Sequence, residues 1–425
     1  MKEDFLHYVW KYKLFNTSAL LTQNNEQLRI INFGIHNTDA GPDFFNGKVI
    51  IGQTTWAGNI EIHVNASDWN KHKHQFDKAY DNVILHVVYH NDKTIHDKDG
   101  NAIPTLELKD NVEEALIDRY DQLIDASNSN WIPCGEQIKT IDNFTIKSWI
   151  NRLIVERLER KSLEIQETLN FNKNNWEETF YQYLFKYFGL KVNAQPFELL
   201  AKNTPLKIIE KHNDLFSIEA LLYGQSGYLE ENIKEEYYAK LKKEYHFLKS
   251  KFSLSPIDKS LWKLLRLRPS NFPTIRISQL AHLLHNHTRF FNKIIKAESI
   301  NEMQKLFNVE ASNYWDNHYH FGVRVNEKKN KRIGINTINN ILINVIVPFT
   351  FVYGKAKQKE EFVNKSLNLL ENIKVENNSI IKKWAELGVK SSNAMDTQSL
   401  IELKNNYCSQ KKCLNCSIGN KLLQQ

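Results

Sequence analysis

Residues 43–64 read DFFNGKVIIGQTTWAGNIEIHV and decide the fold of the N-terminal part of the chain. Two runs rich in β-branched and aromatic residues, 44–51 and 54–64, stand on either side of Gly52. Such runs with a glycine between them predict two strands joined by a turn. If the two strands pair through this turn, the start of the first strand lies beside the end of the second.

The second strand has one apolar face and one polar face. Because successive strand side chains point to opposite faces, Ile60, Ile62 and Val64 share one face, and Glu61 and His63 share the other. The apolar set suits a core. The polar pair must be solvated or bound to a ligand.

Regular elements flank these two strands on both sides. Before them, the pattern predicts a short amphipathic helix over residues 4–14 and a strand over 28–33. After them, it predicts a helix over 67–80, a buried strand over 83–89 and a further strand over 105–108. The order helix, three strands, helix, strand indicates an α+β fold.

From about residue 140 the chain has the 3.6-residue periodicity of helices. We therefore expect two domains: an α/β domain over residues 1–130 and a mainly helical domain over residues 131–425. The expected helices span residues 143–169, 176–188, 233–252, 277–295, 299–307 and 362–385.

Charge divides unevenly between these two parts. The whole chain of 425 residues has a formal net charge of +7. Residues 1–130 hold 12 Lys and Arg against 19 Asp and Glu, and the remainder holds 44 against 30. An acidic part can hold cations and a basic part can hold phosphates, although ordinary solvated surfaces give the same asymmetry.

Composition excludes several classes of protein. With 15 Gly and 9 Pro the chain is neither collagen-like nor of low complexity, and four Cys do not make a disulfide scaffold. The longest apolar run, residues 341–353, is shorter than the roughly 20 residues of a membrane span. The N-terminus lacks the basic and apolar regions of a secretory signal. We therefore expect a cytoplasmic protein.

Asp43, Glu61 and His63 form the first candidate site. Asp43 begins the strand that precedes Glu61, so pairing of the two strands can bring both carboxylates together. Two carboxylates with an imidazole or a main-chain oxygen suit a hard cation such as Mg²⁺. A hairpin with two solvated acids is the alternative. Lys48, on the intervening strand, is a further source of positive charge.

These residues resemble the motif of the PD-(D/E)xK nuclease superfamily. Pro42-Asp43 is similar to its first half and Glu61-Ile62-His63 to its second, with His in place of Lys. The resemblance implies hydrolysis of phosphodiester bonds with bound Mg²⁺ or Mn²⁺. Asp43, Glu61 and the Ile62 carbonyl would hold the metal, and His63 would take the position of the lysine that helps to activate water. A neutral His can instead ligate metal itself, so the change leaves activity open.

A longer resemblance covers nearly the full chain. The blocks DAGPDFFNGKV, GNIEIHV, SDWNKH, YDNVILHVVY and RLRPSNFPTIRISQLA are similar to a bacterial family classed as a domain of unknown function. That resemblance implies no particular activity.

Other histidines are weighed in the same way. His72 falls on the apolar face of its expected helix, which favours packing over metal binding. His74 and Asp77 lie on the other face, where they either approach the strand site or meet water. The position of His86 inside the apolar run VILHVVY favours a buried, hydrogen-bonded side chain in the core. The HLLHNH run at residues 282–287 favours helix-surface histidines over a chelate.

The cysteines form the second candidate site. Cys408, Cys413 and Cys416 have the spacing C-x4-C-x2-C, and the one remaining cysteine is Cys134. A closed site needs four ligands, so the count predicts a Cys₄ site for Zn²⁺ or a [4Fe–4S] cluster. The arrangement resembles that of iron–sulfur nucleases of the same superfamily, although Cys134 follows the nuclease-like core instead of preceding it. Reduced thiols without metal, or a site with a His ligand, are the alternatives.

Basic residues of the helical part form the third candidate site. Arginines bracket the loop RLRPSNFPTIR, lysines form a short run near residue 330, and aromatic residues are interleaved. This combination suits contacts with nucleic acid, although solvated faces around a core give the same pattern. The candidate residues are Arg266, Arg268, Arg276, Lys328 and Lys329.

Two functions fit these observations. The first is a metal-dependent nuclease whose basic helical domain holds DNA or RNA. The second is an inactive scaffold that keeps a nuclease-like fold and binds nucleic acid or protein.

Overall fold

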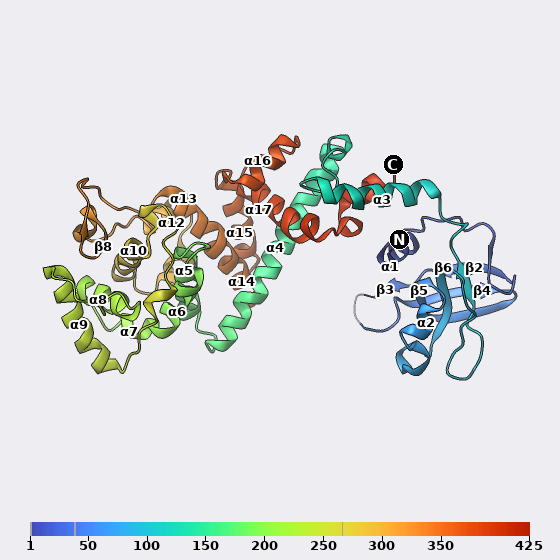
Figure 1. The fold of residues 1–425 in the computed structure, drawn as a ribbon, viewed down its shortest axis with the longest axis horizontal. Coiled ribbons are helices and arrows are strands. Elements are labelled where there is room, and N and C mark those ends of the chain that lie inside the picture. The colour runs from blue at the N-terminus through green and yellow to red at the C-terminus, as the bar shows by residue number, and fades with distance from the viewer. Residues whose placement is uncertain (1, 38–39, 266) are drawn as a thin grey trace. The chain divides into compact units, whose positions relative to one another are not determined.

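The computed structural model describes residues 2–37, 40–265 and 267–425. The chain forms two compact units, whose elements are labelled in Figure 1. Unit 1 comprises Met1–Ile150, Glu386–Gly388 and Glu402–Gln425, and unit 2 comprises Asn151–Ala385 and Val389–Ile401. The C-terminal segment therefore belongs to the same unit as the N-terminal strands, whereas the sequence analysis assigned it to the helical part.

A mixed sheet forms the centre of unit 1. Its strand order is β1-β2-β4-β5-β6-β7, with β3 paired to β4. Neighbours from β1 to β5 are antiparallel, and β5, β6 and β7 are parallel. The strands are β1 (Leu20–Leu21), β2 (Gln27–Asn32), β3 (Ile35–His36), β4 (Phe44–Ile51), β5 (Thr54–Asn65), β6 (Val83–His90) and β7 (Thr105–Glu107).

The turn between β4 and β5 forms as the sequence predicts. Ile51 pairs with Thr54, which leaves a two-residue turn, and Gly52 has a φ of +59°. A tight hairpin requires this left-handed backbone at its first turn position, and glycine adopts it without strain.

A β-bulge in β4 sets which residues meet near the start of the strand. Gly47 pairs with Gly58 and Phe44 with Ile60, so three steps along β4 match two along β5. Asn46 has a φ of +58° at this point. The extra residue places Phe44 and Ile60, both buried, on the same face. It thereby turns the preceding residue, Asp43, toward the opposite face.

Among the residues that the structure describes, four α-helices belong entirely to unit 1. They are α1 (Glu3–Tyr12), α2 (Asp68–Lys71), α3 (Glu114–Ser129) and α18 (Ser417–Leu423). α1 buries Phe5, Val9 and Trp10, as its amphipathic pattern predicts.

The single helix that we expected over residues 67–80 does not form. α2 ends at Lys71, Lys73 has a φ of +64°, and two 3₁₀ turns follow at His74–Phe76 and Lys78–Tyr80. The left-handed residue breaks the helical path, so the expected helix faces do not apply to His72 and His74.

Unit 2 is helical. The helix expected over residues 176–188 forms with these bounds as α5, whereas the one expected over 277–295 is two helices because Arg289 has a φ of +50°. Most of α4 also lies in this unit. Its helices are α4 (Asn143–Phe171), α5 (Trp176–Phe188), α6 (Ala194–Asn203), α7 (Leu206–Ile209), α8 (Leu215–Gln225), α9 (Glu236–Phe252), α10 (Pro273–Asn286), α11 (Phe290–Lys296), α12 (Ile300–Leu306), α13 (Ile335–Ile341), α14 (Val347–Lys357), α15 (Glu360–Asn372), α16 (Ser379–Glu386) and α17 (Ala394–Glu402), with a short hairpin of β8 (His318–His320) and β9 (Val323–Arg324).

Within the described ranges, one helical stretch is long and apolar enough to cross a membrane. It runs from Ile335 to Lys357, and 67% of its apolar window is buried inside the structure. A core helix of a soluble protein has these properties.

Candidate metal centre

Asp43 and Glu61 meet through two hydrogen bonds, one from the backbone of Asp43 to Glu61 and one from the backbone of Ile62 to Asp43. The Asp43 N–H donates to Glu61 Oε2 over 3.1 Å, and the Ile62 N–H donates to Asp43 Oδ2 over 2.9 Å. The bulge in β4 makes this exchange possible, because it places Asp43 on the polar face of the sheet. Glu61 is only 4% exposed, so its carboxylate lies in a site and not on a solvated hairpin.

His63 lies in a chain of three imidazoles. Its Nδ1 is 2.8 Å from His86 Nε2, and its Nε2 is 3.1 Å from His72 Nδ1. His63 and His86 are both buried. β5 and β6 run parallel with Glu61 opposite His86, which explains why the two strands deliver these side chains to one place.

His74 completes a trio with His63 and His72. One ring nitrogen from each of the three lies within 4.8 Å of the other two. His74 Nε2 is 3.4 Å from Glu61 Oε1, yet it is buried and forms no hydrogen bond. Its ring stacks on Tyr80 with centroids 3.8 Å apart, which fixes its plane.

α1 closes the other side of the carboxylate pair. His7 Nε2 lies 3.2 Å from Asp43 Oδ2 and 4.0 Å from Glu3 Oε1. Sequence analysis did not include Glu3 or His7 in the site. The run of acids and a histidine at the start of the chain is a weak signal, because acids are common in the first turn of any helix.

Burial sets the charge of the central groups. It raises the pKa of Glu61 to about 9, with a further rise from the Asp43 charge. Burial also lowers the pKa of His63 to about 2, of His86 to about 3 and of His74 to about 4, and neighbouring imidazoles add to each shift. At neutral pH the metal-free site therefore presents neutral imidazoles with free lone pairs beside Glu61, whose buried carboxyl group keeps its proton.

Acid is expected to destabilise the metal-free protein through these histidines. Their folded pKa values lie below the unfolded value of 6.5, so below pH 6.5 the unfolded chain binds protons that the folded chain does not. The unfolding free energy should fall from pH 6.5 toward pH 4. His74→Gln should make this fall shallower by about 1.4 kcal/mol per pH unit, the value for one proton. Urea unfolding in EDTA at pH 5, 6 and 7 measures both slopes, and an unchanged slope in the variant contradicts the pKa of His74.

The interpretation of His72 as a packed histidine is wrong. His72 is exposed, and its Nδ1 faces His63 because the helix ends before it. His86 is buried and hydrogen-bonded, as its place in VILHVVY indicates. Lys48 is exposed and pairs with Ala57, so it lies outside the site.

Comparison with known families finds one match. A family model described as "Protein of unknown function (DUF2851)" matches residues 3–379. The chain belongs to the DUF2851 family. No curated protein and no solved structure matches it. The matched residues include the carboxylates and histidines described above, and also Cys134. The other three cysteines lie after residue 379.

All four cysteines of the DUF2851 chain line one pocket in unit 1. Cys134, Cys413 and Cys416 are buried, and Cys408 is partly exposed. Gly419 lets the chain close around them, because a Cβ there would come within 2.2 Å of the Cys413 carbonyl oxygen. The remaining residues that line the pocket are Leu123, Pro133, Tyr407, Lys412 and Gly419.

The thiols of this DUF2851 pocket influence one another. Burial raises the pKa of Cys134 to about 12, and the neighbouring Cys416 and Cys413 raise it further. Burial also raises the pKa of Cys408, and the other three cysteines add to the effect. Without a metal these thiols are protonated at neutral pH, and a bound metal would make them thiolates.

The prediction that Arg276 of unit 2 contacts nucleic acid is wrong. Arg276 is 3% exposed, and its guanidinium donates to Asn271, Gln279 and Thr337. Its role is structural, because a guanidinium that is buried and bonded to side chains of the core cannot reach a phosphate. The other candidates of the DUF2851 chain that the structure describes, Arg268, Lys328 and Lys329, are exposed, and Arg266 lies outside the described residues.

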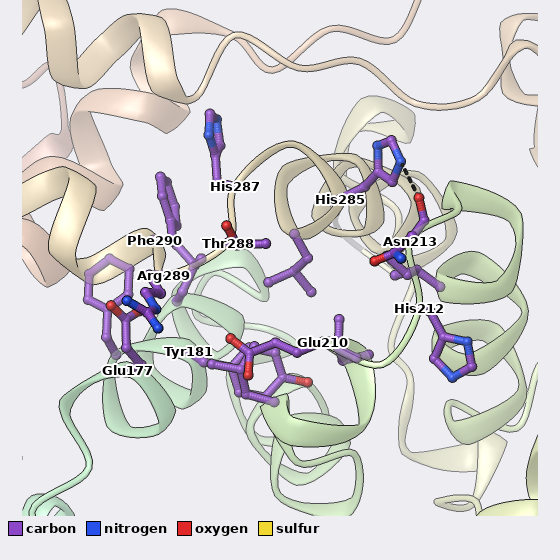
Figure 2. Close-up of a pocket in the computed structure, with 16 residues that line it drawn as sticks. Glu177, Tyr181, Glu210, His212, Asn213, His285, His287, Thr288, Arg289 and Phe290 are labelled. Atoms are coloured by element: carbon purple, nitrogen blue, oxygen red, sulfur yellow. Dashed lines mark hydrogen bonds between the residues drawn. The ribbon is translucent and has the colours of Figure 1, made fainter.

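A pocket of about 120 Å³ lies among the helices of unit 2 (Figure 2). Figure 2 shows His285 and His287 on separate sides of it. Each histidine of the HLLHNH run contacts a backbone carbonyl: His282 that of Ser278, His285 that of Asn213 and His287 that of Leu306. These rings do not converge on one point, which agrees with the interpretation of separate helix-surface histidines.

Proposed function

We propose that this protein is a metal-dependent nuclease that hydrolyses phosphodiester bonds in DNA or RNA. The observation that carries the proposal is the contact of Asp43 with Glu61 at the sheet position where antiparallel β4 and parallel β6 flank β5. Two adjacent carboxylates beside a neutral imidazole suit the binding of a divalent cation and the activation of water.

The topology supports the same proposal. The order α1, β2, β4, β5, α2, β6, with three antiparallel strands and then a parallel one, is similar to the core of the PD-(D/E)xK superfamily. Fold similarity alone does not assign an activity, so the argument depends on the site.

The residues present fit a hard cation. Asp43 Oδ2 and Glu61 Oε2 each accept one backbone N–H, which leaves lone pairs on both carboxylates. Asp43, Glu61 and the Ile62 carbonyl would hold Mg²⁺ or Mn²⁺. When bound, the ion lowers the pKa of the attacking water molecule and neutralises part of the negative charge on the phosphate. His63, which is neutral, would take the place of the lysine of the superfamily beside that water.

An inactive scaffold that binds nucleic acid or protein is the second candidate. It is favoured by the position of His63, since both of its ring nitrogens already face other imidazoles. A lysine at this position would carry a positive charge that His63, with a pKa of about 2, does not.

Unit 2 would hold the nucleic acid. Arg268, Lys328 and Lys329 are exposed, and Lys328 pairs only loosely with Asp316 over 3.9 Å. Exposed cations of this kind bind the phosphate backbone irrespective of sequence.

Cleavage assays with and without metal test the nuclease proposal. Single- and double-stranded DNA and RNA are incubated with the full chain in Mg²⁺, in Mn²⁺ and in EDTA. We expect metal-dependent cleavage that Asp43→Asn reduces by about 100-fold or more, since loss of a charged ligand costs several kcal/mol. Asp81→Asn is the matched control. Equal nucleic-acid binding by wild type and Asp43→Asn, with no cleavage by either, supports the scaffold instead.

We further propose that the cysteine pocket holds a [4Fe–4S] cluster or Zn²⁺. The four cysteines line one pocket, and four thiolates suit either a tetrahedral Zn²⁺ or a [4Fe–4S] cluster.

A cytoplasmic location fits these proposals. Four unpaired thiols are stable in a reducing compartment, and the longest apolar helical stretch is mostly buried.

A further inference from the structure

We propose that His63, His72 and His74 form a binding site for a divalent transition metal ion of the iron-to-zinc series. This ion is distinct in chemistry from the Mg²⁺ or Mn²⁺ of the carboxylate pair. Binding of the ion does not depend on the proposed nuclease activity, but any role for it in cleavage rests on that proposal.

The spacing of the three rings carries the inference. One nitrogen from each ring lies within 4.8 Å of the other two, and His63 Nε2 is 3.1 Å from His72 Nδ1. Tetrahedral Zn²⁺ with Zn–N bonds of about 2.0–2.1 Å places its nitrogen ligands about 3.3 Å apart. Small rotations of the exposed His72 ring therefore suffice to bring three lone pairs to one ion.

The surroundings hold two of the three rings in place. His86 lies 2.8 Å from His63 Nδ1, so a proton between these two nitrogens leaves His63 Nε2 free for a metal. Tyr80 stacks on the His74 ring. His74 Nε2 is buried without a hydrogen bond, which is costly for a polar atom unless a ligand satisfies it.

The ligand type selects the class of metal. Imidazole nitrogens suit Zn²⁺, Fe²⁺, Ni²⁺ or Cu²⁺ and are poor ligands for Mg²⁺. Glu61 Oε1 lies 3.4 Å from His74 Nε2 and 3.7 Å from His63 Nε2, so a carboxylate stands next to the trio. Three histidines leave a coordination position open, which is typical of catalytic and not of structural zinc sites.

Titration with Co²⁺ tests this inference. Co²⁺ reports its coordination by visible absorption, and the cysteine pocket is distinguished by its thiolate charge-transfer bands. The full chain, freed of loosely bound metal, is compared with the double variant His72→Ala/His74→Ala. Both residues lie outside the sheet, so we expect the variant to fold. The matched control is His282→Ala/His285→Ala, which removes two histidines of unit 2.

We expect wild type and control to bind about one more Co²⁺ per chain through nitrogen ligands than the double variant. The affinity of this step should fall at least about 100-fold in the double variant, and an excess of Mg²⁺ should not displace the ion. Equal nitrogen-type spectra and stoichiometry in wild type and double variant would overturn the inference, as would displacement by Mg²⁺.

Asp43→Asn separates the two proposals. Asp43 gives no atom to the histidine trio, so this variant should still bind Co²⁺ at the trio while it loses cleavage. If Co²⁺ binding depends on His72 and His74 but no condition gives cleavage, the proposal of the metal site is supported and the nuclease proposal is wrong. If Asp43→Asn abolishes cleavage but the double variant binds Co²⁺ as wild type does, the nuclease proposal is supported and the proposal of the metal site is wrong.

Discussion

Cys413→Ser is expected to remove the metal of the cysteine pocket and to release the C-terminal segment from unit 1. The pocket joins Cys134 to three cysteines that follow it by more than 270 positions, so a bound metal closes a very long loop. Structural metal binding can contribute of the order of 10 kcal/mol to folding. Losing even a third of that would lower Tm by roughly 6–12 °C in a unit of this size, so we expect a fall of at least this size.

Metal analysis of anaerobically purified protein and thermal unfolding measure this effect. Wild type should hold about four irons with absorption near 400 nm, or about one zinc without colour. Cys134→Ser should give the same loss as Cys413→Ser, because both supply one site. Ser409→Ala, an exposed neighbour of Cys408, is the control. If Cys134→Ser retains its metal while Cys413→Ser loses it, the four-cysteine site is wrong.

Glu61→Gln is expected to abolish cleavage while it stabilises the metal-free protein. Loss of a metal-ligating charge should lower the rate by about 1000-fold, equivalent to about 4 kcal/mol. The stability effect has the opposite sign. The folded pKa of Glu61 is raised to about 9, so between pH 4.5 and 9 the folded chain holds a proton that the unfolded chain releases. The stability due to this proton is complete below pH 4.5 and is lost as the pH rises through 9.

Thermal unfolding in EDTA from pH 6 to 9 measures this difference. Wild type should lose stability across the range, whereas Glu61→Gln should lose less. Added Mn²⁺ should stabilise wild type more than the variant, because the ion compensates the buried charge. The matched control is Glu26→Gln, an exposed residue outside the site, which should change neither cleavage nor the slope. A variant that is both inactive and less stable in EDTA contradicts this account of Glu61.

Much of unit 1, and α5 of unit 2, could be predicted from the sequence because the signals for these elements are local. β4 and α5 have the bounds that periodicity and turn residues predict, and β5 and β6 end one residue beyond theirs. The alternation in β5 correctly separates Glu61 from the apolar face. The cysteine count predicts a group of four, and the pocket contains all four.

Other parts of the site depend on backbone geometry that sequence patterns do not show. His72 and His74 reach His63 because Lys73 adopts a left-handed conformation and breaks the helix. A helical wheel assumes a continuous helix, so it placed these two residues on opposite faces. Arg276 appears basic and exposed in a loop pattern, yet α10 begins at Pro273 and carries it into the core.

The bulge at Asn46 makes the site a matter of backbone conformation as well as of residue type. If the two strands paired regularly with every residue retained, Phe44 would stand opposite Glu61. Every acid and histidine would still be present in the sequence, but Asp43 would point to the other side of the sheet. A β-branched residue at position 46, which disfavours the left-handed backbone found there, would therefore work against the carboxylate pair while each motif residue is retained. A residue outside the motif then helps to decide whether the site forms.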